Sequence, residues 1–85
     1  MEYVIIAFRS RAHTVKFFEL LRNGGMAVEI VNTPKEAGVG CGLSVKFSKN
    51  NIGLAKNALR YRLLDSYAGT FLITNVGGKR IVRTI

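Results

Sequence analysis

A chain of 85 residues, 48% of them hydrophobic, has room for one domain and is too apolar to be disordered. No apolar run approaches the roughly 20 residues of a transmembrane helix, and no basic leader precedes the first apolar run, so we expect a single cytoplasmic domain over residues 1–85. One cysteine excludes an internal disulfide, and one histidine with five scattered acidic residues argues against a metal site, a cofactor site or paired-carboxylate catalysis.

The net charge of +8 indicates attraction to an anionic partner such as nucleic acid, an acidic protein or a small anion. A basic surface that only keeps a small protein soluble explains the charge equally well. The basic residues are spread along the chain, with local clusters only at Arg60-Tyr61-Arg62 and at Lys79-Arg80.

The first half of the chain alternates strand and helix patterns. Residues 3–8 form a continuous apolar run typical of a strand buried on both faces. Ser10 can cap a helix over residues 11–23, and Gly24-Gly25 would end it. A strand pattern over 26–30 follows and ends at Asn32-Thr33-Pro34. The expected inner stripe of the helix is Ala12, Val15, Phe18 and Leu21, widened by Phe17 and Leu20.

The second half begins with a glycine-rich loop over 35–42 and a third strand in which Leu43, Val45 and Phe47 alternate with polar residues. Asn50 or Asn51 can cap a second helix that runs to about residue 64. Residues 67–69 indicate a turn, 70–76 a strand, and Gly77-Gly78 a hairpin turn into a closing strand over 80–85. The expected inner stripe of the second helix is Ile52, Ala55, Leu59 and Leu63.

The predicted order is therefore β-α-β-β-α-β-β. This order is typical of an α+β, ferredoxin-like split βαβ sandwich with two helices on one face of a mixed sheet. A different strand order stays open, because the sequence does not reveal which strands pair.

Cys41, in a Gly-Cys-Gly step, is the best candidate for covalent chemistry. A thiol reacts as the thiolate, and its ordinary pKa of about 8.5 leaves little thiolate at neutral pH. Gly40 and Gly42 would allow close approach of a partner's sulfur or selenium, and Lys35 and Lys46 would favour the anion. The alternative is a buried structural cysteine, since free cysteine often packs as a small hydrophobe.

Thr-Pro-Lys-Glu at 33–36, four residues, and then Cys-Gly-Leu-Ser-Val at 41–45 resemble the central motif of the selenium/sulfur carrier-like family, a small bacterial family. The spacing from Pro34 to Cys41 is the most specific part of the resemblance. Lys35 stands where we expect arginine, which loses a bidentate donor. Gly38-Val39-Gly40 replaces a small, serine-rich run, which removes hydroxyl contacts to a bound group.

The resemblance implies a carrier rather than an enzyme. Cys41 would hold sulfur or selenium as a persulfide or perselenide, supported by a loop containing Pro34, Lys35, Gly40 and Gly42. The implied partners are a sulfur- or selenium-donor enzyme and an acceptor protein. A homodimer is a further option.

Other functions stay open at this stage. His13 could act as a base for Cys41 only if the fold brought the two together, and we expect it to face solvent or the helix end. An RNA-binding sheet could stack bases on Phe8 and Phe47, although the expected signature is absent and both fit a core register. A partner-binding module could use the closing strand, Arg80–Ile85, as a pairing edge.

Overall fold

The apolar run near the N-terminus becomes the central strand of the sheet. The computed structural model describes residues 1–39, 42–61 and 65–85. The elements follow the chain as β1 (Glu2–Phe8), α1 (Arg11–Asn23), β2 (Glu29–Asn32), the 3₁₀ turn η1 (Lys35–Ala37), β3 (Leu43–Phe47), the 3₁₀ turn η2 (Lys49–Asn51), α2 (Ile52–Tyr61), β4 (Tyr67–Val76) and β5 (Lys79–Thr84).

The fold is mixed α+β, with two helices and one five-stranded sheet in the order β2-β3-β1-β4-β5. All four pairs of neighbouring strands are antiparallel, so the expectation of a mixed sheet is wrong. The reason is that the connection from β1 through α1 to β2 leaves one position free between them, and β3 fills it. The sheet also has one strand more than a simple βαββαβ arrangement, because β5 pairs with β4.

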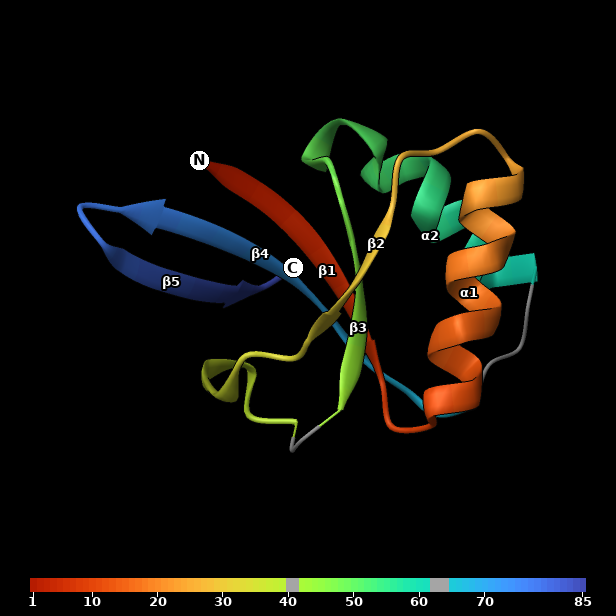
Figure 1. Cartoon of the computed structure of the whole chain (residues 1–85), viewed down its shortest axis with the longest axis horizontal. Coiled ribbons are helices and arrows are strands. Elements are labelled where there is room, and N and C mark those ends of the chain that lie inside the picture. Colours follow the sequence, from red (N-terminus) through yellow and green to blue (C-terminus); the bar gives the residue numbers. More distant parts are fainter. Residues whose placement is uncertain (40–41, 62–64) are drawn as a thin grey trace.

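Two apolar clusters lie on opposite faces of the sheet. Both helices cover one face, as expected, and Figure 1 shows them together on that side. The cluster on the other face is smaller and is covered in part by the connection between β2 and β3. The helix-side cluster contains Val4, Ile6, Phe8, Phe17, Leu21, Val45, Phe47 and Ala55. The opposite cluster contains Ile5, Ala7, Phe71 and Ile73, with Val31, Ala37, Val39 and Val82 packed against it.

Helix α1 has the predicted limits. Ser10 caps it by accepting a hydrogen bond from the His13 amide. At the other end Gly25 takes a φ of +88°, and the Met26 amide donates to the Leu21 carbonyl, as in a Schellman cap.

The inner face of α1 differs from the predicted stripe. Thr14, Phe17 and Leu21 are the buried residues of this helix. Ala12 and Val15, which the apolar stripe placed inside, are exposed. Thr14 can replace an apolar residue because its hydroxyl is hydrogen-bonded within the fold.

Strand β2 begins later than predicted. The pattern over 26–30 indicated a strand there, but the ladder with β3 runs from Glu29 to Asn32. Met26 still belongs to the helix cap, and both Met26 and Val28 pack against the helix-side cluster. Their alternation therefore reflects packing beneath the helices and not pairing in the sheet.

Helix α2 is preceded by a 3₁₀ turn. Ser48 caps that turn by accepting from the Asn50 amide, and the cap predicted at Asn50 or Asn51 for α2 stays a prediction. Ile52 and Leu59 pack against the helix-side cluster as predicted, and Leu63 lies outside the described residues. Neither helix, in the part of the chain that the structure describes, has the length and apolar character that crossing a membrane requires.

Strand β4 is longer than predicted. The segment expected to be a turn, 67–69, already pairs with β1, although the register shifts between Ala7 and Phe8. Gly69 has a φ of +154°, and a Cβ there would stand 2.8 Å from the Phe71 ring. Gly77 and Gly78 both have positive φ angles and form the predicted hairpin turn into β5.

Candidate functional site

The loop over 33–42 joins β2 to β3 and is closed at its base. The Thr33 amide donates to the Gly42 carbonyl over 2.9 Å, which extends the ladder one pair beyond Asn32 and Leu43. The hydroxyls of Thr33 and Ser44 lie 2.6 Å apart in a second hydrogen bond, and Ser44 is fully buried. The chain therefore has fixed positions on both sides of this loop.

The first part of the loop folds over the face of the sheet that lies opposite the helices. Pro34 is buried, and Ala37 and Val39 pack against the cluster on that face. Gly38 has a φ of +70° and ends the 3₁₀ turn. The predicted loop thus has an ordered apolar attachment to the sheet (Figure 1, yellow to yellow-green).

An ion pair attaches the same turn to β5. The Arg80 guanidinium donates to the two oxygens of Glu36 over 3.0 and 2.9 Å, a bidentate geometry. The hydrogen bond from Arg80 lowers the pKa of Glu36, and the same contact raises the pKa of Arg80. Both side chains are nearly half exposed, so the pair acts mainly as a geometric tie.

The residues proposed from the motif fall partly within the described chain. Cys41 and Gly40 lie outside the described residues. Gly42 is exposed just before β3, and a Cβ there would stand at an ordinary 3.5 Å from the Phe8 carbonyl. Lys35 is exposed on the 3₁₀ turn.

Lys46 lies away from the Gly42 end of β3. Its ammonium is 4.3 Å from the centroid of the Tyr3 ring, at the opposite end of β1 from Phe8. Leu43 and Lys46 are three steps apart along the strand, about 10 Å. The role predicted for Lys46 at the thiol stays a prediction, and its described contact is with Tyr3.

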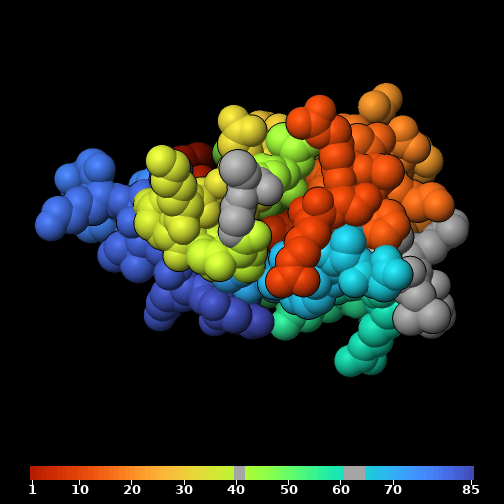
Figure 2. Space-filling view, turned by 90° about the horizontal axis from the view of Figure 1, so that it is seen from below, coloured from red at the N-terminus to blue at the C-terminus, as the bar shows by residue number. Residues whose placement is uncertain are grey.

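Two arginines that the sequence did not single out lie beside Gly42. An open cavity of about 370 Å³, here called the arginine cavity, is lined by Arg9, Arg11, Asn32, Gly42 and Leu43. Figure 2 looks onto this end of the molecule, where the loop (yellow to yellow-green) and the β1–α1 turn with the start of α1 (orange-red) share one face. The cavity thus combines two cations with the residue that follows Cys41.

Thr14 fixes the wall of the arginine cavity. Its fully buried hydroxyl lies 3.2 Å from the Leu43 carbonyl and 3.3 Å from the Ser10 carbonyl, and it can donate its one proton to either. This contact joins the first turn of α1 to the start of β3. The chain segments that carry the two arginines and Gly42 are therefore held together by the fold.

His13 has its own partners on the other side of the helix start. Its Nδ1 lies 2.6 Å from the Ser66 hydroxyl and 3.8 Å from an Asp65 carboxylate oxygen. At this end of the helix it faces the segment before β4 and not open solvent, so the solvent alternative is wrong. A role as a base for Cys41 stays untested, since Cys41 is outside the described residues.

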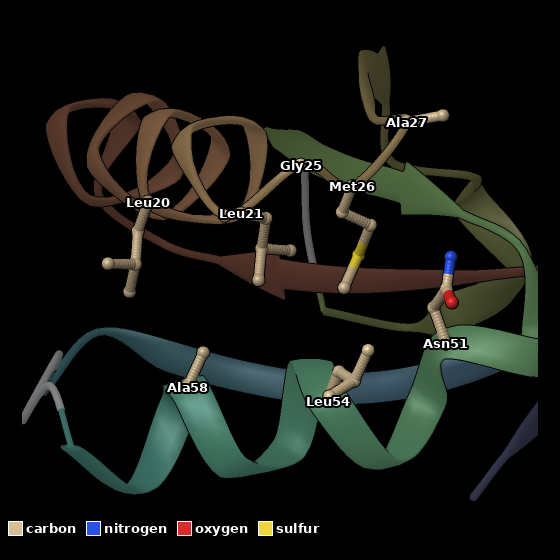
Figure 3. A pocket seen from close by; sticks show the side chains of 9 residues that line it. Leu20, Leu21, Gly25, Met26, Ala27, Asn51, Leu54 and Ala58 are labelled. Carbon is tan, nitrogen blue, oxygen red and sulfur yellow. The ribbon is translucent and has the colours of Figure 1, made fainter.

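A separate groove lies between the end of α1 and α2. It has a volume of about 330 Å³, and Leu54 at its edge is 64% exposed. Figure 3 shows Leu20, Leu21 and Met26 pointing toward Leu54 and Ala58 across the gap. The described lining residues include no titratable side chain, so the groove offers apolar contact and no acid–base chemistry.

The aromatic residues considered for RNA stacking are in the core. Phe8 and Phe47 are each 3% exposed and belong to the helix-side cluster. The core interpretation of both residues is confirmed. No group of three or more His, Cys, Asp or Glu side chains capable of holding a metal occurs within residues 1–39, 42–61 and 65–85.

The fold and the site define a small α+β protein with an anchored loop and a cationic cavity at one end of its sheet. The chain belongs to the family described as "Putative Se/S carrier protein-like", whose model matches residues 3–64. The matched region includes β1, the whole 33–42 loop and β3, so the family resemblance is confirmed. No curated protein and no solved structure matches the chain.

Proposed function

We propose that the protein carries sulfur or selenium, and that Cys41 is the acceptor atom. The observation that supports this most directly is the Pro34-to-Cys41 motif in a chain that belongs to a Se/S carrier-like family. Cys41 would take the chalcogen from a donor enzyme as a persulfide or perselenide and pass it to an acceptor protein. The chain alone would perform no turnover, and we infer that it works in the cytoplasm.

The physical requirement for this role is a thiolate that can be reached. A nearby positive charge lowers a thiol pKa from its usual value of about 8.5. Arg9 and Arg11 lie beside Gly42, and exposed Lys35 lies in the same loop. These cations support a thiolate at residue 41, and the exposed Gly42 supports access.

The attachment of the loop supports a carrier in a second way. A carrier must offer the same thiol first to a donor and then to an acceptor. The hydrogen bonds of Thr33 at the base of the loop and the Glu36–Arg80 pair hold the flanking chain in place. A preorganised loop costs less ordering entropy when each partner binds.

We also infer a ferredoxin-like scaffold for this function. The neighbours β2-β3-β1-β4, with both helices on one face, fit a split βαβ sandwich, and β5 adds an edge strand. The Lys79–Thr84 edge and the basic surface give places where an acidic donor or acceptor protein could dock.

The test is intact-mass analysis after exposure to a cysteine desulfurase-type or selenium-supplying donor. The wild-type chain should gain one sulfur or selenium atom that dithiothreitol removes, and Cys41→Ser should gain none. Native Cys41 should also react with iodoacetamide at pH values below the ordinary thiol pKa of about 8.5. A thiol that reacts only after the protein is unfolded would rule out the carrier role.

A further inference from the structure

We propose that the arginine cavity binds the oxyanion end of a small sulfur or selenium donor, with the sulfonate of thiosulfate as its simplest form. The inference rests on the proposed function for the choice of donor, and on the described geometry for the site itself. The proposed site makes small oxyanion-bearing sulfur or selenium donors the substrate class for the 33–42 loop.

Two guanidinium groups face the same cavity. Arg9 and Arg11 line one open cavity together, and guanidinium groups match the oxygens of sulfonate, sulfate and phosphate. Neither arginine has a carboxylate partner among the ion pairs of the described residues. Asp65, which is near His13, is not one of the lining residues. The two charges are therefore available to an external anion.

The rest of the lining also suits an anion. Asn32 adds an amide that can donate hydrogen bonds, and Gly42 brings backbone into the wall without a side chain. Arg11 is the first residue of α1, so the partial positive charge of that helix end lies close to one of the two arginines. Thr14 joins α1 to Leu43, so the two sides of the cavity are set before any anion arrives.

One lining residue of the cavity is next to Cys41 in the sequence. Gly42, one of its lining residues, follows Cys41 directly. In the transfer, the Cys41 thiolate attacks the terminal sulfur of thiosulfate, the S–S bond breaks, and sulfite leaves with the electron pair. The product is the persulfide anion, and the step consumes no oxidant or reductant. A site that holds the sulfonate would stabilise the charge that develops on the leaving sulfite.

The experiment titrates the Cys41→Ser protein, which cannot react, with thiosulfate, sulfate and, as a control for screening, chloride at low ionic strength. Calorimetry and the NMR signals of the arginine Nε–H groups report binding. We expect saturable binding of thiosulfate and sulfate at about millimolar concentration, as two exposed charge-assisted contacts allow. No saturation, or an equal response to chloride, would overturn the site.

Matched variants separate a built site from net charge. Arg9→Gln and Arg11→Gln should each weaken thiosulfate binding about five- to tenfold. Arg22→Gln removes the same charge at the far end of α1, roughly 16 Å of helix from Arg11, and should change affinity by about twofold at most, because a charge at that distance interacts weakly through water. Arg11→Lys keeps the positive charge but loses the bidentate guanidinium geometry. It should weaken thiosulfate binding more than Arg22→Gln and less than Arg11→Gln. Equal weakening by all the glutamine variants would contradict the proposal.

The two proposals can fail separately. If the Cys41→Ser protein binds thiosulfate and the wild-type chain gains sulfur from no donor, the carrier function is wrong and the anion site stands. If the wild-type chain gains sulfur from a donor enzyme while thiosulfate does not bind, the carrier function stands and this inference is wrong.

Discussion

Replacing Thr14 with valine tests whether the first turn of α1 and the start of β3 are held together as described. The two side chains have nearly the same shape, so the change removes the hydroxyl and little packing. Thr14 is fully buried, and its hydroxyl oxygen lies 3.2 Å from the Leu43 carbonyl oxygen and 3.3 Å from the Ser10 carbonyl oxygen. The substitution removes the proton that can be donated to either. Losing one net hydrogen bond, and leaving the part-buried Leu43 carbonyl short of this donor, should cost about 1–2 kcal/mol.

That cost is measurable in a domain of this size. About 1 kcal/mol lowers the Tm of a 60–100-residue domain by roughly 4–8 °C, so Thr14→Val should lower it by about 5–15 °C. Urea unfolding followed by circular dichroism should show a lower midpoint and an unchanged slope. Thr84→Val, at an exposed position, should stay within about 0.5 kcal/mol of the wild type. If Thr14→Val unfolds like the wild type, the hydroxyl does not join the two elements.

Three further changes test other parts of the account. Gly69→Ala puts a Cβ 2.8 Å from the Phe71 ring at a φ of +154°, and should cost about 1–3 kcal/mol in urea unfolding. Gly42→Ala meets only an ordinary contact, so it should stay within about 0.5 kcal/mol of the wild type and yet slow alkylation of the neighbouring thiol. Arg80 lowers the pKa of Glu36 in the folded protein below its ordinary value of 4.5. The pair therefore stabilises the fold fully at pH above 4.5. This stabilisation is lost as the pH falls through the pKa that Glu36 has in the folded protein.

Each of these has a contradicting outcome. A Gly69→Ala protein as stable as the wild type would mean that the neighbouring ring moves away at no cost. A Gly42→Ala protein alkylated at the wild-type rate would remove the argument for access. For the ion pair, Glu36→Gln should flatten the acid side of a stability-against-pH curve. An unchanged curve would show that other carboxylates carry the acid dependence.

The sequence predicted best what is determined by neighbouring residues. The limits of α1 were predicted because Ser10 and Gly24-Gly25 mark its ends locally. The turn at Gly77-Gly78 was predicted because positive φ angles favour glycine. Strand pairing is not local, so neither the wholly antiparallel sheet nor the early start of β4 at Tyr67 could be predicted from the pattern.

The inner face of α1 shows a similar limit. The apolar stripe pointed to Ala12 and Val15, but the buried face includes Thr14, whose hydroxyl finds carbonyl partners only in the folded chain. A pattern that counts only apolar residues therefore misses a buried threonine.

The candidate site shows the same difference between local features, which the sequence predicts, and non-local ones, which it does not. The motif around Cys41 and the buried Pro34 could be identified from residues close together in the sequence. The arginine cavity could not, because Arg9 and Arg11 are more than twenty residues from Gly42 and meet it only through the pairing of β1 with β3. The available signal was the net charge of +8, which predicted an anionic partner but no location.

The most direct test of the central proposal is the rate of alkylation of native Cys41 as a function of pH, followed by intact-mass analysis after exposure to a sulfur or selenium donor. We predict a reaction midpoint below the ordinary thiol pKa of about 8.5, and one added chalcogen atom that is absent from Cys41→Ser. Arg9→Gln combined with Arg11→Gln should move the midpoint upward. A native thiol that is inert at every pH at which the protein stays folded, and that gains no sulfur or selenium, would contradict the account.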